Sequence, residues 1–99
     1  MPKAYWTSFY EKIAEPEIQK KYAEKATVAI KKFGGIFLCR GGASICLEGS
    51  KSPRIVIVEF PSYESAEKCY NSKEYKEALN ILKNSAKRNL QIVEGFSTE

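Results

Sequence analysis

Two residues of this chain, Arg40 and Glu59, carry the side chains of a simple acid–base site. An arginine holds an anionic substrate through charge-assisted hydrogen bonds, and a glutamate accepts or donates a proton. Arg40 and Glu59 are therefore the candidate catalytic residues. The same pair would also serve as a structural ion pair that fixes the register of two strands.

The expected hairpin places this pair close together. If Glu48 faces Arg54 across the turn between them, counting back along the hairpin sets Ala43 near Glu59. A bulge at the two glycines before Ala43 then brings Arg40 closer to Glu59. We therefore expect an ion pair between Arg40 and Glu59.

Aromatic side chains form a second candidate site. Trp6, Tyr22, Tyr70 and Tyr75 would line a cleft between a sheet and its helices, and an aromatic pocket with a few polar groups is typical of a small-molecule site. Their spacing also matches the buried stripes of ordinary core helices. We take Trp6, Tyr22 and Tyr70 as candidate ligand-binding residues, with core packing as the alternative.

The residue types that are missing exclude several kinds of site. The chain has no His and no Asp, and its three cysteines, Cys39, Cys46 and Cys69, form no Cys-x-x-Cys pattern. We expect no metal site, no haem and no other cofactor. Unpaired cysteines favour a reducing, cytoplasmic setting, in which Cys69 is the thiol we expect to react most readily. The densest apolar run, 55–58, is far too short for a membrane span.

The net charge of +4 raises the question of nucleic-acid binding. Most lysines alternate with glutamates along the predicted helices, which is typical of solvated helix surfaces. No helix-turn-helix, basic region or aromatic RNA-binding motif accompanies the charge. We therefore do not expect a nucleic-acid partner.

The pattern of strands and helices predicts the fold. Apolar alternation, capping residues and glycines indicate a strand at 3–10, a helix at 16–33, a strand at 36–40 resumed at 43–48, a strand at 54–60, helices beginning after Ser62 and Ser72, and a strand at 89–95. This β-α-β-β-α-β order predicts one α+β domain, residues 1–99, of the ferredoxin-like type, with a four-stranded antiparallel sheet covered by helices on one face.

The opposite face of that sheet would be strongly apolar. The 54–60 strand presents either Ile55 and Ile57 or Val56 and Val58 to that face, and neither set suits contact with water. A second sheet is expected to cover it. We therefore predict a homodimer in which two sheets face each other.

A series of short sequence phrases resembles a known family. They are Lys3-Ala4-Tyr5-Trp6, the run from Gly34 to Gly42, Val58-Glu59-Phe60-Pro61-Ser62, Tyr70-Asn71-Ser72-Lys73-Glu74-Tyr75, Arg88, and Val93-Glu94-Gly95. In this order they resemble the bacterial domain-of-unknown-function family numbered 1330, within the dimeric α/β-barrel superfamily. The resemblance implies a ferredoxin-like protomer that pairs into a barrel. The wider superfamily includes cofactor-free monooxygenases, lactone isomerases, haem enzymes and ligand-binding regulators, and fold alone does not choose among them.

Two functions fit these residues. The first is a homodimeric α/β-barrel protein that binds a small anionic or aromatic metabolite between sheet and helices; as an enzyme it would be a cofactor-independent oxygenase or isomerase, with Arg40 orienting the substrate and Glu59 moving a proton. The second is a non-catalytic binding, regulatory or protein-interaction module. A deep pocket with convergent polar groups favours the first, and a filled interior favours the second.

Overall fold

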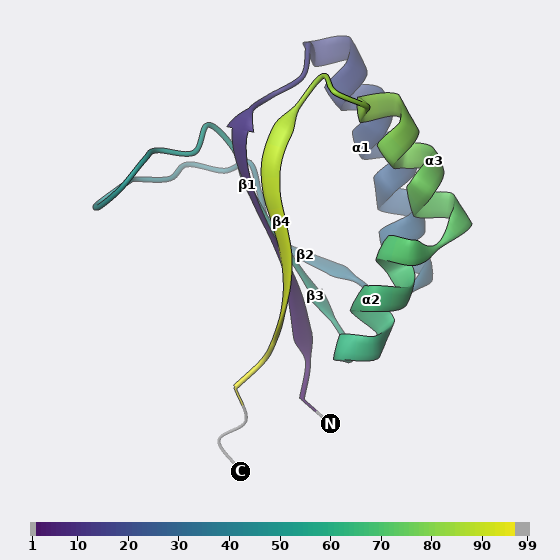
Figure 1. Cartoon of the computed structure of the whole chain (residues 1–99). Helices are drawn as coiled ribbons and strands as arrows, with labels where there is room; N and C mark the ends of the chain where they lie inside the picture. The colour runs from purple at the N-terminus through teal and green to yellow at the C-terminus, as the bar shows by residue number, and fades with distance from the viewer. Residues whose placement is uncertain (1, 97–99) are drawn as a thin grey trace.

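The computed structural model describes residues 2–96 and has the expected α+β, ferredoxin-like architecture (Figure 1). Its elements are β1 (Ala4–Lys12), α1 (Pro16–Lys32), β2 (Ile36–Arg40), β3 (Ile55–Phe60), α2 (Tyr63–Asn71), α3 (Lys73–Leu82) and β4 (Lys87–Glu94). The strands form one antiparallel sheet in the order β2-β3-β1-β4. All three helices cover the same face of this sheet, which we call the inner face.

Local sequence explains where the helices begin and end. Pro16 occupies the first turn of α1, Glu17 lies at the positive end of the helix dipole and Lys31 and Lys32 lie at its negative end. The hydroxyl of Ser62 accepts a hydrogen bond from the Ser65 amide at the start of α2. Ser72 caps α3 in the same way, so the two predicted capping serines divide this region into two helices.

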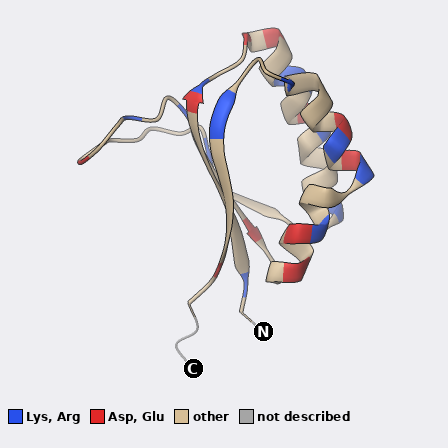
Figure 2. Ribbon diagram, viewed as in Figure 1, with Lys and Arg blue, Asp and Glu red and all other residues tan. Residues whose placement is uncertain are grey.

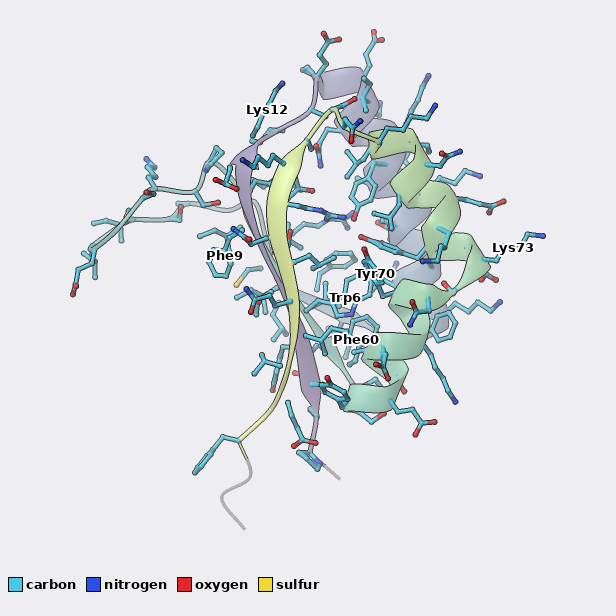
Figure 3. The ribbon with its side chains drawn as sticks, in the orientation of Figure 1. Trp6, Phe9, Lys12, Phe60, Tyr70 and Lys73 are labelled. Atoms are coloured by element: carbon cyan, nitrogen blue, oxygen red, sulfur yellow. The ribbon has the colours of Figure 1, made fainter. Side chains whose placement is uncertain are left out.

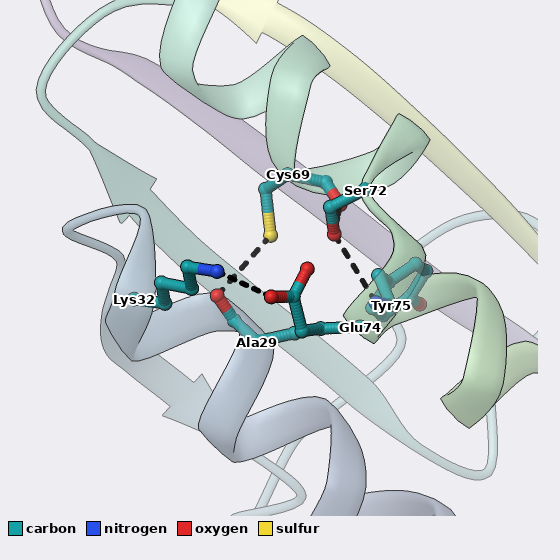
Figure 4. A network of polar contacts seen from close by, with 6 residues as sticks. All are labelled: Ala29, Lys32, Cys69, Ser72, Glu74 and Tyr75. Carbon is teal, nitrogen blue, oxygen red and sulfur yellow. Dashed lines mark hydrogen bonds and ion pairs between the residues drawn. The ribbon is translucent and has the colours of Figure 1, made fainter.

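A few polar contacts join the helices to one another (Figure 4). Lys32 at the end of α1 forms an ion pair with Glu74 in the first turn of α3. The thiol of Cys69 in α2 lies 3.7 Å from the carbonyl oxygen of Ala29 in α1. On the outward helix surfaces, basic and acidic side chains alternate, in line with the solvated surfaces expected from the sequence (Figure 2).

Cys69 corrects an expectation about reactivity. Its side chain is completely buried, and this burial raises the pKa of the thiol to about 12. Since the thiolate is the reactive form, Cys69 is the least reactive of the three cysteines, whereas Cys39 and Cys46 are exposed. The apolar spacing of Tyr63, Ala66 and Tyr70 predicts a buried side of α2 that excludes Cys69, whereas the helix buries Ala66 and Cys69.

The register of the sheet places three rows of side chains across the inner face. From β3 through β1 to β4 these rows are Arg54–Tyr10–Arg88, Val56–Ser8–Leu90 and Val58–Trp6–Ile92. Ile55 and Ile57 therefore point to the opposite, outer face. The outer face also carries Phe9 and Val93, which are 42% and 51% exposed, so it is an uncovered apolar surface as expected.

The expected continuation of β2 at 43–48 is wrong. Gly41 adopts a left-handed conformation with φ of 68°, and its amide makes a last hydrogen bond to the Ile55 carbonyl oxygen. Residues 42–53 then leave the sheet as an irregular arm, which projects beyond the outer face in Figure 1. We call this segment the arm. Because it forms no ladder with β3, the hairpin register expected from the Glu48–Arg54 pairing does not exist.

Among residues 2–96, no helix has both the length and the apolar character needed to cross a bilayer.

Candidate functional site

A partly enclosed cavity lies between α1 and the inner face of the sheet. The cavity volume is about 30 Å³, and the surrounding hollow of about 430 Å³ includes space that is open to solvent. Its lining comes from all four strands, from α1 and from the end of the arm: Trp6, Ser8, Tyr10, Gln19, Tyr22, Ala23, Ala26, Ile30, Phe37, Arg40, Arg54, Val56, Val58, Arg88 and Leu90. A cavity this narrow fits a small molecule or part of a larger one.

The two ends of the cavity differ in chemistry. The first row of the sheet contributes Arg54, Tyr10 and Arg88 at one end. The third row contributes Val58 and Trp6 at the other end, and Ile30 of α1 and Phe37 of β2 also line the cavity. The cavity therefore has a basic, polar end and an apolar end.

Arg88 is the centre of a hydrogen-bond network at the basic end. Its Nη1 donates to the hydroxyls of Tyr22 at 3.0 Å and Tyr10 at 3.4 Å, and its Nη2 donates to the Tyr75 hydroxyl at 2.8 Å. The hydroxyls of Tyr22 and Tyr75 are 2.5 Å apart. The three phenols thus solvate the Arg88 guanidinium, which has no carboxylate partner. These hydrogen bonds connect β4 to α1 and α3.

The Tyr22 and Tyr75 phenols of this network are held in their protonated form. Burial raises the pKa of Tyr22, with the nearby Arg88 charge acting in the opposite direction. Burial likewise raises the pKa of Tyr75. At neutral pH these side chains therefore act as neutral hydrogen-bond partners of Arg88, and Arg88 keeps its full charge.

Arg40 closes the side of the cavity next to α1. Its Nη2 donates to Thr27 Oγ1 at 2.6 Å and lies 3.4 Å from the Ala23 carbonyl oxygen, and its guanidinium stacks 3.9 Å above the ring of Phe37. The expected ion pair with Glu59 is wrong, because β2 and β3 pair with Arg40 opposite Val56. That register puts Arg40 on the inner face.

Glu59 lies on the other side of the sheet from Arg40. It is opposite Ile36 on β2 and Tyr5 on β1, and its carboxylate pairs with Lys3 Nζ at 2.8 Å. The hydrogen bond and charge of Glu59 raise the pKa of Lys3. Glu59 therefore does not reach the cavity, and its expected role as proton-transfer group has no geometric support.

Two buried polar atoms of the cavity have no hydrogen-bond partner within residues 2–96: Ser8 Oγ and Arg54 Nε. Ser8 is 3% exposed and lies in the middle of the sheet between Val56 and Leu90. Such an unsatisfied buried group destabilises a fold by about 1–3 kcal/mol, so native proteins rarely keep one without a reason. Both residues line the same cavity.

The three predicted aromatic ligand-binding residues divide into two groups. Trp6 and Tyr22 line the cavity, and Trp6 Nε1 is occupied by a hydrogen bond of 3.0 Å to the Ala66 carbonyl oxygen. Tyr70 is not part of the lining. It packs behind the cavity against Trp6, with ring centroids 6.1 Å apart, and against Tyr75 (Figure 3).

Several lining residues were missed by sequence reasoning, above all Ser8, Arg54 and Arg88. A signal for Ser8 was present, because it alternates with Ala4, Trp6 and Tyr10 on a strand whose inward positions are otherwise apolar or aromatic. The arginines also carried a signal, since they are three among sixteen basic residues and all three line the cavity. Their convergence could not be inferred without the register.

Metal binding finds no support at this site. Within the described part of the chain, no three Cys, His, Asp or Glu side chains converge in a way that would ligate a metal ion. The cavity lining contains none of these residue types.

Solved structures similar to this one share its fold. A protein of unknown function from Rhodopseudomonas palustris superposes with a TM-score of 0.74 at 16% identity, covering 97% of this chain and 84% of that one. SnoaB, a cofactor-independent oxygenase from Streptomyces nogalater, has a TM-score of 0.66 at 8% identity, covering 99% and 97%. A dimeric ferredoxin-like protein of unknown function from Thermobifida fusca has a TM-score of 0.56 at 12% identity, covering 95% and 92%.

Sequence comparison identifies the family. No curated protein is similar enough in sequence to count as a match. Residues 3–96, nearly the whole chain, match the family DUF1330, a domain of unknown function. This match agrees with the resemblance seen in the sequence phrases and with the dimeric ferredoxin-like folds above, and the chain therefore belongs to the DUF1330 family.

Proposed function

We propose that this protein is a homodimeric α/β-barrel protein that binds a small metabolite in the cavity between α1 and the sheet. The observation that carries the proposal is the lining: a mostly apolar cavity into which three arginines, a serine and two tyrosines converge. Cavities of this composition are typical of small-molecule sites. The buried, unpartnered Ser8 Oγ and Arg54 Nε support a polar ligand over a filled interior.

We assign binding rather than a reaction. The lining has no carboxylate and no thiol, and the phenol of Tyr22 is held protonated beside Arg88. The fold shared with the oxygenase SnoaB is compatible with many functions. Arg40, expected from the sequence to be a catalytic residue that orients the substrate, lies at the cavity wall and is a ligand contact within this proposal.

A thermal-shift screen against a metabolite library tests binding. A ligand present at a hundredfold its Kd stabilises a protein by about 2.7 kcal/mol, which shifts the Tm of a domain of this size by several degrees. The variant Ala23→Leu would fill the cavity from α1, whereas Glu24→Leu adds a similar side chain at an exposed position of the same helix. If the ligand raises the Tm of Glu24→Leu but not that of Ala23→Leu, the ligand binds in the cavity. If the ligand raises the Tm of both variants equally, it binds elsewhere.

The second part of the proposal, the homodimer, rests on the outer face. Phe9, Ile36 and Val93 are each at least two-fifths exposed there, and a monomer rarely leaves such a surface in water. The arm carries Ile45 and Leu47, more than three-quarters exposed, beyond the same face. A second copy pairing face to face would cover both surfaces, and the similar protein from Thermobifida fusca is dimeric.

A further inference from the structure

The unpartnered atoms of the cavity allow its ligand to be described more closely. We propose that the cavity binds a small monocarboxylic acid as its anion, with the carboxylate held by Arg54 and Ser8 and an apolar body directed toward Trp6. This inference rests on the proposed function, because it names the ligand class of the same cavity.

The positive charge of the cavity lining favours the binding of an anion. All three arginines of the chain line it, and the lining has no acidic residue. Each ion pair found within residues 2–96 joins a lysine to a glutamate, so no arginine has a carboxylate partner there. A partly buried guanidinium without a counter-charge is unfavourable, and a bound anion would remove that penalty.

The unoccupied donors mark where the anion would sit. The Arg88 nitrogens Nη1 and Nη2 already donate to tyrosine hydroxyls, and Nη2 of Arg40 donates to Thr27. Arg54 Nε and the Ser8 hydroxyl have no such partner. A carboxylate presents two oxygens, and these are the natural acceptors for a guanidinium N–H and a hydroxyl.

The register places these two donors within reach of one ligand. The Arg54 carbonyl oxygen accepts a hydrogen bond from the Tyr10 amide, and Tyr10 and Ser8 are inward-facing neighbours on β1. Neighbouring strands are about 4.8 Å apart and residues two apart on a strand about 6.6 Å, so the α carbons of Arg54 and Ser8 are about 8 Å apart, a span that the arginine side chain and a carboxylate together can bridge. The Arg54 guanidinium lies back against Gly41, at the edge of the same cavity.

The other end of the cavity selects an apolar body and only one acidic group. Val58, Ile30 and Phe37 supply no donor, and the indole N–H of Trp6 is already bonded to the Ala66 carbonyl oxygen. A second carboxylate at that end would be buried without partners. The narrow interior also disfavours large anions such as nucleotides.

The experiment compares carboxylates with their own amides. A panel of aliphatic acids of three to eight carbons, benzoate and phenylacetate is titrated by calorimetry into the intact protein, each beside its neutral primary amide and beside inorganic phosphate. At least one carboxylate should bind about tenfold or more tightly than its amide, because the amide lacks the charge that Arg54 would recognise. Phosphate, which has no apolar body, should bind more weakly than that acid.

Variants assign the binding to the two donors. Arg54→Gln should raise the Kd of the best carboxylate about tenfold or more, and Ser8→Ala should raise it severalfold. Lys51→Gln, which removes a positive charge from the exposed arm, is the matched control and should change the Kd less than twofold. Equal effects of Arg54→Gln and Lys51→Gln would overturn the assignment in favour of a general charge effect.

Ser8→Ala also separates a binding role from a structural one. Since the hydroxyl has no partner in the structure, its removal should leave the melting temperature of the free protein unchanged or raised while binding weakens. A clear fall in melting temperature would show that the hydroxyl has a structural partner and would contradict its role as a vacant donor. Thus loss of binding without loss of stability is the expected signature.

The outcomes distinguish this inference from the proposed function. If amides bind as tightly as acids and Ala23→Leu abolishes both, the cavity binds small molecules and the carboxylate inference fails alone. If no acid or amide binds, the carboxylate inference is overturned; if the metabolite screen also yields no ligand sensitive to Ala23→Leu, the proposed function fails with it.

Discussion

The guanidinium of Arg54 lies directly against the α carbon of Gly41, so that a Cβ built on Gly41 would be 2.3 Å from Arg54 Nη1. Gly41 is also the residue whose left-handed conformation turns the chain from β2 into the arm. One glycine thus sets both the end of the strand and the position of a charged wall of the cavity. A Cβ built on the neighbouring Gly42 would have no atom within 4 Å, and the φ of Gly42 is not positive. Alanine substitutions at Gly41 and Gly42 are therefore a matched pair.

Gly41→Ala should destabilise the protein by about 1–2 kcal/mol, because a side chain in the left-handed region is strained. It should also displace the Arg54 guanidinium and weaken carboxylate binding. Urea unfolding and calorimetry measure both effects. Gly42→Ala should change neither by more than about 0.5 kcal/mol. If both alanine variants behave alike, the contact between Gly41 and Arg54 has no consequence for the site.

Tyr75→Phe should destabilise the protein by about 1–3 kcal/mol. The change removes the acceptor of Arg88 Nη2, and it leaves the Tyr22 hydroxyl with Arg88 Nη1 as its remaining partner. Chemical denaturation measures the difference. Tyr63→Phe, at a residue 45% exposed, is the control and should lie within about 0.5 kcal/mol of the wild type. If Tyr75→Phe leaves the free energy of unfolding unchanged, Arg88 is adequately solvated without this hydroxyl.

Alkaline pH should destabilise the protein through the same network. The pKa values of Tyr22 and Tyr75 are raised in the folded state, mainly by burial, whereas an unfolded tyrosine ionises near pH 10. Above that pH the unfolded chain binds fewer protons than the folded one. The free energy of unfolding therefore falls, by about 1.4 kcal/mol per pH unit for each phenol that stays protonated.

Urea midpoints between pH 8 and pH 11 check this dependence, and absorbance at 295 nm follows phenol ionisation. The double variant Tyr22→Phe/Tyr75→Phe should lose less stability over that range than Tyr63→Phe, which keeps both buried phenols. Parallel loss in the two proteins would show that the buried phenols ionise as readily as exposed ones.

Val93→Glu should convert the proposed dimer to a monomer. Val93 lies opposite Tyr5 on the outer face, and a carboxylate there would be buried in a sheet-to-sheet interface without a partner. Light scattering coupled to size-exclusion chromatography gives the mass. Val28→Glu makes the same substitution at an exposed position of α1 and should remain dimeric. A wild type that is monomeric at micromolar concentration would contradict the dimer directly.

Alkylation should leave Cys69 unmodified in the folded protein. At pH 8 a thiol whose pKa is about 12 has almost no thiolate, and the side chain is fully buried. Iodoacetamide followed by peptide mass spectrometry should find modification at Cys46 on the exposed arm. In urea, Cys69 should react as well. Rapid modification of Cys69 in the native protein would show that α2 opens locally.

The fold was largely predictable because its signals are local. Ser62 and Ser72 both cap helices as expected, and the aromatic residues of β1 and the unbroken apolar run of β3 indicated strands. The segment after Gly41 was not predictable, because Ile45 and Leu47 give it the apolar character of a strand although it has no neighbour to pair with. Strand propensity depends on a partner, which the sequence does not reveal.

The site was less predictable because it depends on register. The expected hairpin would have placed Arg40 near Glu59, whereas the observed pairing of Arg40 with Val56 puts the two side chains on opposite faces. A shift of one residue in register is enough to make such a change. Trp6 and Tyr22 line the cavity whereas Tyr70 packs behind it, a distinction that helix and strand spacing alone does not make.

A crystal structure of the protein grown with its tightest-binding carboxylate tests the binding site most directly. We expect the ligand between α1 and the sheet, with its carboxylate oxygens within hydrogen-bond distance of Ser8 Oγ and Arg54 Nε and its apolar body toward Trp6. A cavity filled only by water, with the carboxylate bound at another surface, would contradict this assignment.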